Sequence, residues 1–298
     1  MSQLHDLLEA FATDRRGDGQ RPSGILSYVQ RLKRFDVWLK GKPVDQLSWI
    51  VITDYRNELA EHCNISTVET AMVTIRAFCR WAVDRGHLAN DVSAKVRVPR
   101  RPQAMPKPLS PDELAALWAA LSDDETVSDQ TQWAIRRNRL VCSLMYYAGL
   151  RKGEVARLRY GDCSLRTRTI TIRASKSNDR VIPIHPALLI ELTDWPVGKN
   201  DDSVVRSWRG GGFTGVGGLG HIFEVWLPYR GVVISSHRLR HSFATEYLRA
   251  TKDIRGLQSL LGHRSLETTQ IYTQVTGDEH RANIAKLPTL NTFGGSPL

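Results

Sequence analysis

The sequence lacks the features that mark secreted, membrane-spanning and disulfide-bonded proteins. Its longest mostly apolar run, Leu140 to Leu150, is much shorter than the roughly 20 residues that a transmembrane helix needs. The first residues, MSQLHDLLEAFATDRR, include acidic side chains and no apolar signal core. No CxxC pair occurs, so we expect reduced cysteines in a cytoplasmic protein. The short apolar runs predict that the chain does not enter membranes. The four cysteines are Cys63, Cys79, Cys142 and Cys163.

Positive charge, in contrast, is in excess. The chain carries 41 Lys and Arg against 31 Asp and Glu, a net charge of +10 at pH 7. A basic surface attracts polyanions, whether DNA, RNA or an acidic membrane face. The excess is shared along the chain, because residues 1–106 hold 16 basic against 12 acidic residues and the remainder holds 25 against 19. This distribution favours two domains that contact one extended anion over a single basic tail.

Apolar periodicity and proline divide the chain into two domains. Residues 1–95 repeat apolar side chains at helical spacing, as in ILSYVQRLKRFDVWL, and predict a small helical domain. Residues 96–109 are rich in proline and basic residues, and proline does not continue a helix, so this segment is a linker. Ser110-Pro111-Asp112-Glu113 then forms a predicted capping box that opens a second domain, residues 110–298.

The second domain is predicted to combine helices with one β-hairpin. In RTITIRASKSNDRVIPIH, apolar residues alternate on both sides of the polar turn SKSND, with Ile170, Ile172, Val181 and Ile184 flanking it and Lys176 at its tip. The predicted fold class is therefore mainly α with a small β-sheet or hairpin, as a helical domain followed by an α+β domain. Helices are expected at 111–121, 131–148, 186–195, 236–250, 253–261 and 265–273.

The glycine-rich string GVGGLG, residues 215–220, matches the GxGxxG pattern of dinucleotide-binding loops. That motif requires a strand before it and an acidic residue about 20 positions later. Here SWRGGGFT precedes it and HRLRH stands downstream. We therefore expect a flexible loop and no nucleotide cofactor.

Four separate stretches carry polar residues that suit one kind of chemistry. Each residue has an ordinary explanation when taken alone, such as a helix cap, a solvated turn or a packing tyrosine. Together, two arginines can bind phosphate oxygens in bidentate fashion, a lysine can protonate a leaving alkoxide, and a tyrosine is an oxygen nucleophile that needs a base. The combination indicates phosphoryl transfer to tyrosine, with charge stabilised by side chains. The residues are Arg151, Lys176, His237, Arg240, His263 and Tyr272.

The spacing of His237 and His241, four residues apart on a predicted helix, also allows a metal site. No carboxylate stands between the two histidines, and a metal ion would lie against two arginines. We therefore expect no metal here, and expect His241 to be a packing neighbour.

The strings AGLRKGEVARL, HRLRHSFAT and LLGHRSLETTQIYTQV resemble the tyrosine recombinase (phage integrase) family, including its small two-domain and Xer-like members. The resemblance is strong over about residues 110–275, and the helical first half resembles the core-binding domain in size and pattern only. It implies a site-specific recombinase in which Tyr272 forms a 3′-phosphotyrosyl link. Arg151 and Arg240 would then clamp the phosphate, Lys176 would be the general acid, and His237 would assist proton removal. His263 would hydrogen-bond the phosphate, and Glu154 would support the arginines.

The resemblance also implies the partners. These are double-stranded DNA with short core sites and a homotetramer that works through a Holliday junction, with a directionality factor as a further candidate. The tail after Tyr272 would dock on the adjacent protomer, and no cofactor is needed. We expect localisation in the cytoplasm, on nucleoid DNA. A type IB topoisomerase and a catalytically inactive DNA-binding protein are the alternatives. The basic linker residues would lie along DNA: Lys95, Arg97, Arg100, Arg101 and Lys107.

Overall fold

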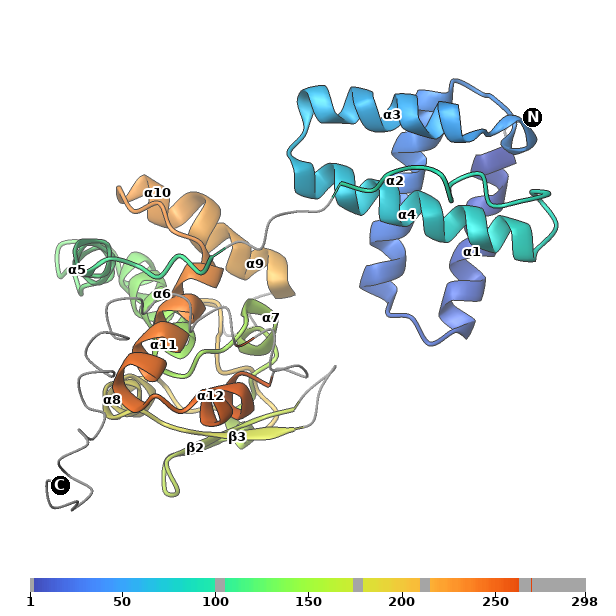
Figure 1. Cartoon of the computed structure of the whole chain (residues 1–298). Helices are drawn as coiled ribbons and strands as arrows, with labels where there is room; N and C mark the ends of the chain where they lie inside the picture. The colour runs from blue at the N-terminus through green and yellow to red at the C-terminus, as the bar shows by residue number, and fades with distance from the viewer. Residues whose placement is uncertain (1–2, 100–104, 174–178, 210–214, 263–268, 270–298) are drawn as a thin grey trace, which may run out of the picture. The chain divides into compact units, whose positions relative to one another are not determined.

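The chain divides into two compact units, residues 1–104 and 105–298. The computed structural model describes residues 3–99, 105–173, 179–209, 215–262 and 269 (Figure 1). No helix within these ranges is both long enough and apolar enough to span a bilayer. The fold is mostly helical with one small sheet, as the sequence predicts.

The first unit is a bundle of four helices around an aromatic core. Phe11, Phe35 and Phe78 are fully buried in it. Side chains cap two of the helices, since Ser48 accepts a hydrogen bond from the Val51 amide (3.3 Å) and Asn64 accepts one from Thr67 (2.9 Å). The helices are α1 (Gln3–Gly17), α2 (Pro22–Leu39), α3 (Trp49–His62) and α4 (Ile65–Asp84), with the 3₁₀ turn η1 (Val44–Gln46) after α2.

The start of the linker packs on this first unit. Val96 is buried in its core, and the Val96 carbonyl accepts a hydrogen bond from Arg76 Nη2 (2.5 Å). Arg56 Nη1 donates to the Arg97 carbonyl (3.2 Å). The side chains of Lys95 and Arg97 remain exposed, so both are open to an anion.

The second unit places a three-stranded antiparallel sheet beside helices (Figure 1). The strands β1 (Cys163–Ser164), β2 (Thr169–Ile172) and β3 (Arg180–Pro183) lie in that order, and Ile170 pairs with Ile182. The helices are α5 (Pro111–Ala120), α6 (Asp129–Tyr147), α7 (Lys152–Val155), α8 (Pro186–Asp194), α9 (Gly215–His221), α10 (Leu227–Tyr229), α11 (Ser236–Thr251) and α12 (Ile254–Leu261). Two short helical segments complete it, the 3₁₀ turn η2 (Tyr160–Asp162) and the π-helical η3 (Ile222–Trp226).

One face of the sheet contributes to the core of the second unit. Ile170 and Ile172 of β2 and Ile182 of β3 are buried there together with residues of α6 and α11. Val181 is exposed, because neighbouring residues of a strand point to opposite faces. Arg180 therefore shares the inward face with Ile182 and Ile184.

The expectation of a flexible loop at GVGGLG is wrong. Residues 215–220 belong to α9, which continues without a break through η3 into α10. Glycine disfavours a helix because it loses much backbone entropy on folding. Burial of Leu219, Ile222 and Leu227 in the core offsets this cost. A Cβ on Gly220 would lie only 3.2 Å from Glu224 Oε1, so a small residue also suits the packing at this point.

The end of the linker is fixed to the second unit by α5 and α11. The predicted capping box is present, with the Ser110 amide bonded to Glu113 Oε2 (2.8 Å) and the Glu113 amide bonded to Ser110 Oγ (3.2 Å). Arg238 of α11 makes a two-pronged ion pair with Glu113 (2.6 and 2.5 Å) and also donates to the carbonyl of Lys107 (3.2 Å). The Leu109 amide donates to Ser242 Oγ (2.7 Å), so α11 holds the chain as it enters this unit.

We predict that Glu113→Gln makes the protein less stable at neutral pH and less sensitive to acid. Hydrogen bonds from Arg238 and Ser110 lower the pKa of Glu113 to about 2, well below its ordinary 4.5. A lowered carboxyl pKa contributes stability above pH 4.5 that is lost as the pH falls toward 2. Urea unfolding of the full chain from pH 7 to 3 would show this. Glu125→Gln, at an exposed turn position, is the control. An unchanged acid dependence in Glu113→Gln would contradict the prediction.

Candidate active site

A tight turn between α6 and α7 sets the position of Arg151. Gly149 adopts φ +63° in this turn, and a Cβ there would overlap the Phe243 ring, so only glycine fits. Leu150 is fully buried and anchors the turn in the core. Arg151 then stands at the N-cap of α7, where its amide donates to Glu154 Oε2 (2.8 Å).

The string HRLRH in the first two turns of α11 sends its two arginines to different places. Arg240 is directed to the turn after α6, and its side chain is only 6% exposed. Its Nη1 donates to the Gly149 carbonyl and its Nη2 donates to the Leu261 carbonyl (2.8 Å). Arg238 is directed to the linker. Only Arg240 therefore belongs to the candidate site.

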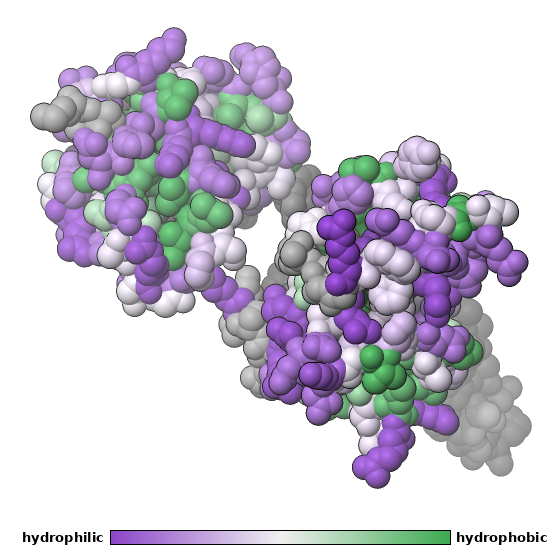
Figure 2. Space-filling view, turned by 180° about the vertical axis from the view of Figure 1, so that it is seen from behind, coloured by the Kyte–Doolittle hydropathy of each residue, from purple (hydrophilic) through white to green (hydrophobic). Residues whose placement is uncertain are grey.

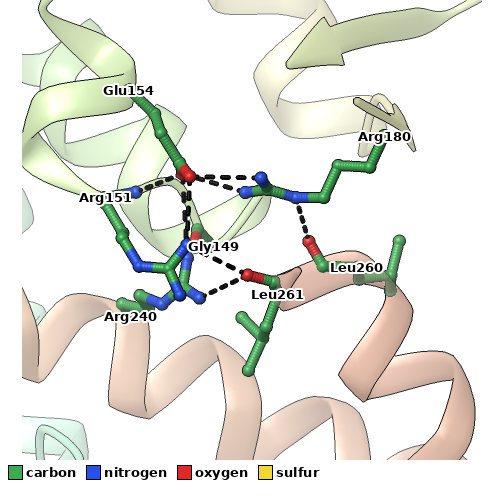
Figure 3. Close-up of polar contacts among 7 residues, drawn as sticks. All are labelled: Gly149, Arg151, Glu154, Arg180, Arg240, Leu260 and Leu261. Atoms are coloured by element: carbon green, nitrogen blue, oxygen red, sulfur yellow. Dashed lines mark hydrogen bonds and ion pairs between the residues drawn. The ribbon is translucent and has the colours of Figure 1, made fainter. Parts of the chain in front are cut away.

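Glu154 is the acidic centre on which three arginines meet (Figure 3). Its Oε1 accepts from Arg151 Nη1 (3.1 Å), and its two oxygens accept from Arg180 Nη1 and Nη2 (3.1 and 2.9 Å). Arg240 Nη1 lies 3.8 Å from Oε2. Burial by itself raises the pKa of Glu154, but the hydrogen bonds from Arg180 and the Arg151 amide, with the charges of Arg180 and Arg240, lower it overall. Glu154 is therefore ionised at neutral pH.

Arg180, at the start of β3, is a site residue that the sequence reasoning missed. Its side chain is 6% exposed, a rare degree of burial for an arginine. The signal in the sequence is its register, since Arg180, Ile182 and Ile184 alternate on the inward face of the strand. An arginine at a core-facing position of a strand needs a buried partner, and here that partner is Glu154.

The carboxyl end of α12 meets the same three arginines. The Leu261 carbonyl accepts from Arg151 Nη1 (3.2 Å) and Arg240 Nη2, and the Leu260 carbonyl accepts from Arg180 Nε (2.7 Å). These are terminal carbonyls of the helix, which carry partial negative charge and have no partner within the helix. Three guanidinium groups thus fix the end of α12 immediately before His263.

Arg151 is the most accessible arginine of the cluster. Its side chain is 40% exposed. Within the described part of the chain, the contacts of its guanidinium use Nη1 alone, which leaves Nε and Nη2 for an anion. A phosphate oxygen pair fits such an edge in bidentate fashion.

His237 and His241 lie next to this cluster and both have lowered pKa values. Partial burial lowers the pKa of His237, and the positive charges of Arg240, Lys152 and Arg151 lower it further. Burial also lowers the pKa of His241, followed by the effects of His237 and Arg240. Both imidazoles are therefore neutral at pH 7, and a neutral imidazole can accept a proton. Lys152, whose charge lowers the pKa of His237, is after Arg180 the second basic residue near the site that the sequence analysis did not select.

The structure brings together part of the predicted catalytic set. Arg151, His237 and Arg240 converge in the second unit, whereas Lys176, His263 and Tyr272 lie outside the described residues. Of the linker residues predicted to bind DNA, Lys95, Arg97 and Lys107 are exposed, and Arg100 and Arg101 lie outside the described ranges. Among residues that the structure describes, no three His, Cys, Asp or Glu side chains are grouped as for a metal ion.

Comparison with known families and proteins identifies relatives over most of the chain. Residues 107–279, more than half of the chain, match the phage integrase family, and residues 7–87 match the N-terminal SAM-like domain of phage integrases. Tyrosine recombinase XerA of Thermococcus kodakarensis is 29% identical over 287 residues, which are 94% of this chain and 95% of the relative. Tyrosine recombinase XerC of Proteus mirabilis is 32% identical over 209 residues, 67% of this chain and 65% of the relative.

A solved structure shares the fold of the chain. The crystal structure of a lambda integrase dimer bound to a COC′ core site covers 92% of this chain and 96% of its own, with a TM-score of 0.73 and 19% identity. At this identity the likeness concerns the fold alone. The family match over residues 107–279 and the recombinase relatives show that the chain belongs to the phage integrase family and is a site-specific tyrosine recombinase.

Proposed function

We propose that the protein cleaves and rejoins DNA at its own recombination sites through a covalent link between Tyr272 and a 3′-phosphate. The observation that carries this proposal is the arginine cluster on Glu154. In it, Arg151 is 40% exposed beside the buried Arg240, and its guanidinium contacts among the described residues use Nη1 alone. Two arginines held in place by a carboxylate suit a phosphodiester that gains negative charge during transfer.

The reaction assigns one role to each group. The Tyr272 hydroxyl attacks phosphorus, the bond from phosphorus to the 5′-oxygen breaks, and Tyr272 loses its proton with the help of His237. Lys176 gives a proton to the departing 5′-oxygen, and His263 hydrogen-bonds the phosphate. Rejoining reverses these steps with the 5′-hydroxyl of another strand, and the energy of the broken bond is kept in the phosphotyrosyl ester.

The proposed substrate is duplex DNA held by both units. Exposed Lys95, Arg97 and Lys107 at the two ends of the linker, with Arg100 and Arg101 between them, would contact the phosphate backbone. Hydrophilic side chains predominate on the face that Figure 2 shows, and hydrophobic ones form small separate patches. We further propose a tetramer on two duplexes that passes through a Holliday junction, as in the crystal structure of a lambda integrase tetramer bound to a Holliday junction. Docking of the tail after Tyr272 on a neighbouring protomer and a directionality factor belong to the same proposal.

The central prediction is that Tyr272→Phe abolishes covalent adducts with DNA while it preserves binding. Removal of the nucleophile leaves no oxygen to form the ester, so adduct formation falls by more than about 10³-fold. Wild type and variant would be incubated with fragmented DNA from the organism or genetic element that encodes the protein. The protein would then be denatured, and the 3′ ends of the DNA that remains covalently attached to it would be sequenced. Tyr229→Phe, at a tyrosine that is 90% exposed, is the matched control and forms adducts like wild type.

The positions of the adducts test the choice of function. Adducts clustered at one short, roughly palindromic sequence support a recombinase. Scattered adducts indicate a topoisomerase-like activity. Absence of adducts from wild type on every DNA, despite salt-dependent binding, would overturn the proposal in favour of an inactive DNA-binding protein.

A second prediction concerns pH. Because the pKa of His237 lies below its ordinary 6.5, the imidazole accepts a proton at neutral pH and loses this ability as the pH falls below that value. The cleavage rate at subsaturating DNA, which reports on the free enzyme, should therefore fall on the acid side below pH 6.5. His237→Gln should be about 10²-fold slower at pH 7.5 and lack this acid limb. His241→Gln should keep the fall in cleavage rate at acid pH. If His237→Gln showed the same fall as wild type, the role of His237 in proton removal would be refuted.

A further inference from the structure

Arg180 joins three segments that the proposed reaction needs. Its Nη1 and Nη2 donate hydrogen bonds to Glu154 of α7, and its Nε donates one to the Leu260 carbonyl at the end of α12. Its guanidinium also packs on Gly262, where a Cβ would come within 3.2 Å of Nη1. Arg180 itself begins β3, four residues after Lys176. One buried side chain therefore connects strand β3, which follows Lys176 in the sequence, with Glu154 and with the end of α12, which precedes His263.

We propose that Arg180 is a positioning residue for DNA strand cleavage, which holds Glu154 and the end of α12 so that Arg151 and Arg240 face the scissile phosphate. This inference rests on the proposed function of the same site. Arg180 does not itself contact the substrate in this proposal, because its Nη1 and Nη2 donate to Glu154 and its Nε donates to the Leu260 carbonyl.

Arg180, Arg151 and Arg240 compete for the two oxygens of the Glu154 carboxylate. Its two oxygens are occupied by the fork of Arg180, by the Arg151 amide and by Arg151 Nη1, and Arg240 Nη1 stays at 3.8 Å from Oε2. Without Arg180, a buried carboxylate would lack its bidentate partner and would draw Arg240 and more of Arg151 to itself. Those contacts would turn both guanidinium groups away from the phosphate.

Arg180 also contributes to the positive charge of the cluster. Arg151, Arg180 and Arg240 with Glu154 carry a net charge of +2, and loss of Arg180 reduces it to +1. The phosphate being transferred gains negative charge as Tyr272 attacks, so the remaining charge would stabilise that state less well. A purely structural contact would not require a charge here, because a well-packed apolar residue often replaces a buried ion pair without loss of stability.

The test uses the full-length protein and a duplex that contains the cleavage site mapped with wild type. Arg180→Gln should cleave roughly 10- to 100-fold more slowly at saturating DNA, as is typical when a supporting partner of a site residue is removed. Its affinity for the duplex should stay within about twofold, since the guanidinium of Arg180 is engaged by Glu154 and the Leu260 carbonyl and makes no phosphate contact in this proposal. The matched control is Arg139→Gln. Arg139 is also partly buried and pairs with Glu191 (3.0 Å) and Asp123 (3.1 Å), but it is not part of the Glu154 cluster.

Cleavage of a duplex with an uncharged linkage at the scissile position distinguishes a positioning role of Arg180 from a general structural role. In a methylphosphonate duplex, a methyl group replaces one non-bridging oxygen at the scissile position, so less negative charge develops during attack by Tyr272. If Arg180 acts through the arginine pair, the difference between wild type and Arg180→Gln should shrink to less than about threefold on this duplex. A defect of equal size on both duplexes would overturn the inference.

A double variant covers the case in which Arg180→Gln fails to fold. Glu154→Gln/Arg180→Gln removes both charges of the buried pair together, so it should fold. The ratio of its cleavage rates on the methylphosphonate and ordinary duplexes should equal that of Glu154→Gln alone. A double variant that is slower than Glu154→Gln by the full effect of Arg180→Gln would show that the two residues act independently, against the inference. Arg180→Gln that cleaves at the wild-type rate would also refute it. Failure of wild type itself to form an adduct would instead refute the proposed function.

Discussion

The buried carboxylate of Glu154 is the constraint on which the rest of the second unit depends. A carboxylate that is 10% exposed must be paired, because an isolated charge in the interior is very costly. One partner, Arg151, lies three residues earlier, and the other two are distant in the sequence: Arg180 on β3 and Arg240 on α11. Pairing with all three requires the strand and both helices to pack in one arrangement. The carboxylate therefore specifies the geometry of the site as well as its charge.

The helical period of α11 explains how one short string serves two purposes. Residues three or four apart share a face of a helix, so His237, Arg240 and His241 lie on one face of α11, and the charge of Arg240 lowers the pKa of both histidines. Arg238 and Ser242, also four apart, point to the linker and bind its backbone. The helix that carries Arg240 is thus also the helix that binds the backbone at the end of the linker.

Local rules account for the parts of the fold that the sequence predicts well. The capping box at Ser110 and the hairpin alternation depend on neighbours within a few residues, so their patterns are complete in the string itself. Two features depend on distant partners and were not predictable in this way. Arg180 finds its carboxylate 26 residues earlier, and its register was the only local sign of burial. The helix at GVGGLG contradicts local propensity, because the core packing of Leu219 and Ile222 decides its structure.

Arg240 is the arginine that is both buried and fixed by backbone carbonyls on two sides. A flexible surface arginine binds phosphate equally well before and during the reaction, whereas a fixed one can be set for the charge that develops as a bond is made. Arg240 is held by two backbone carbonyls as well as by Glu154, so its guanidinium has no freedom to follow the substrate. One of these carbonyls belongs to Leu261, two residues before His263. The placement of the arginines and the placement of the end of α12 therefore depend on each other.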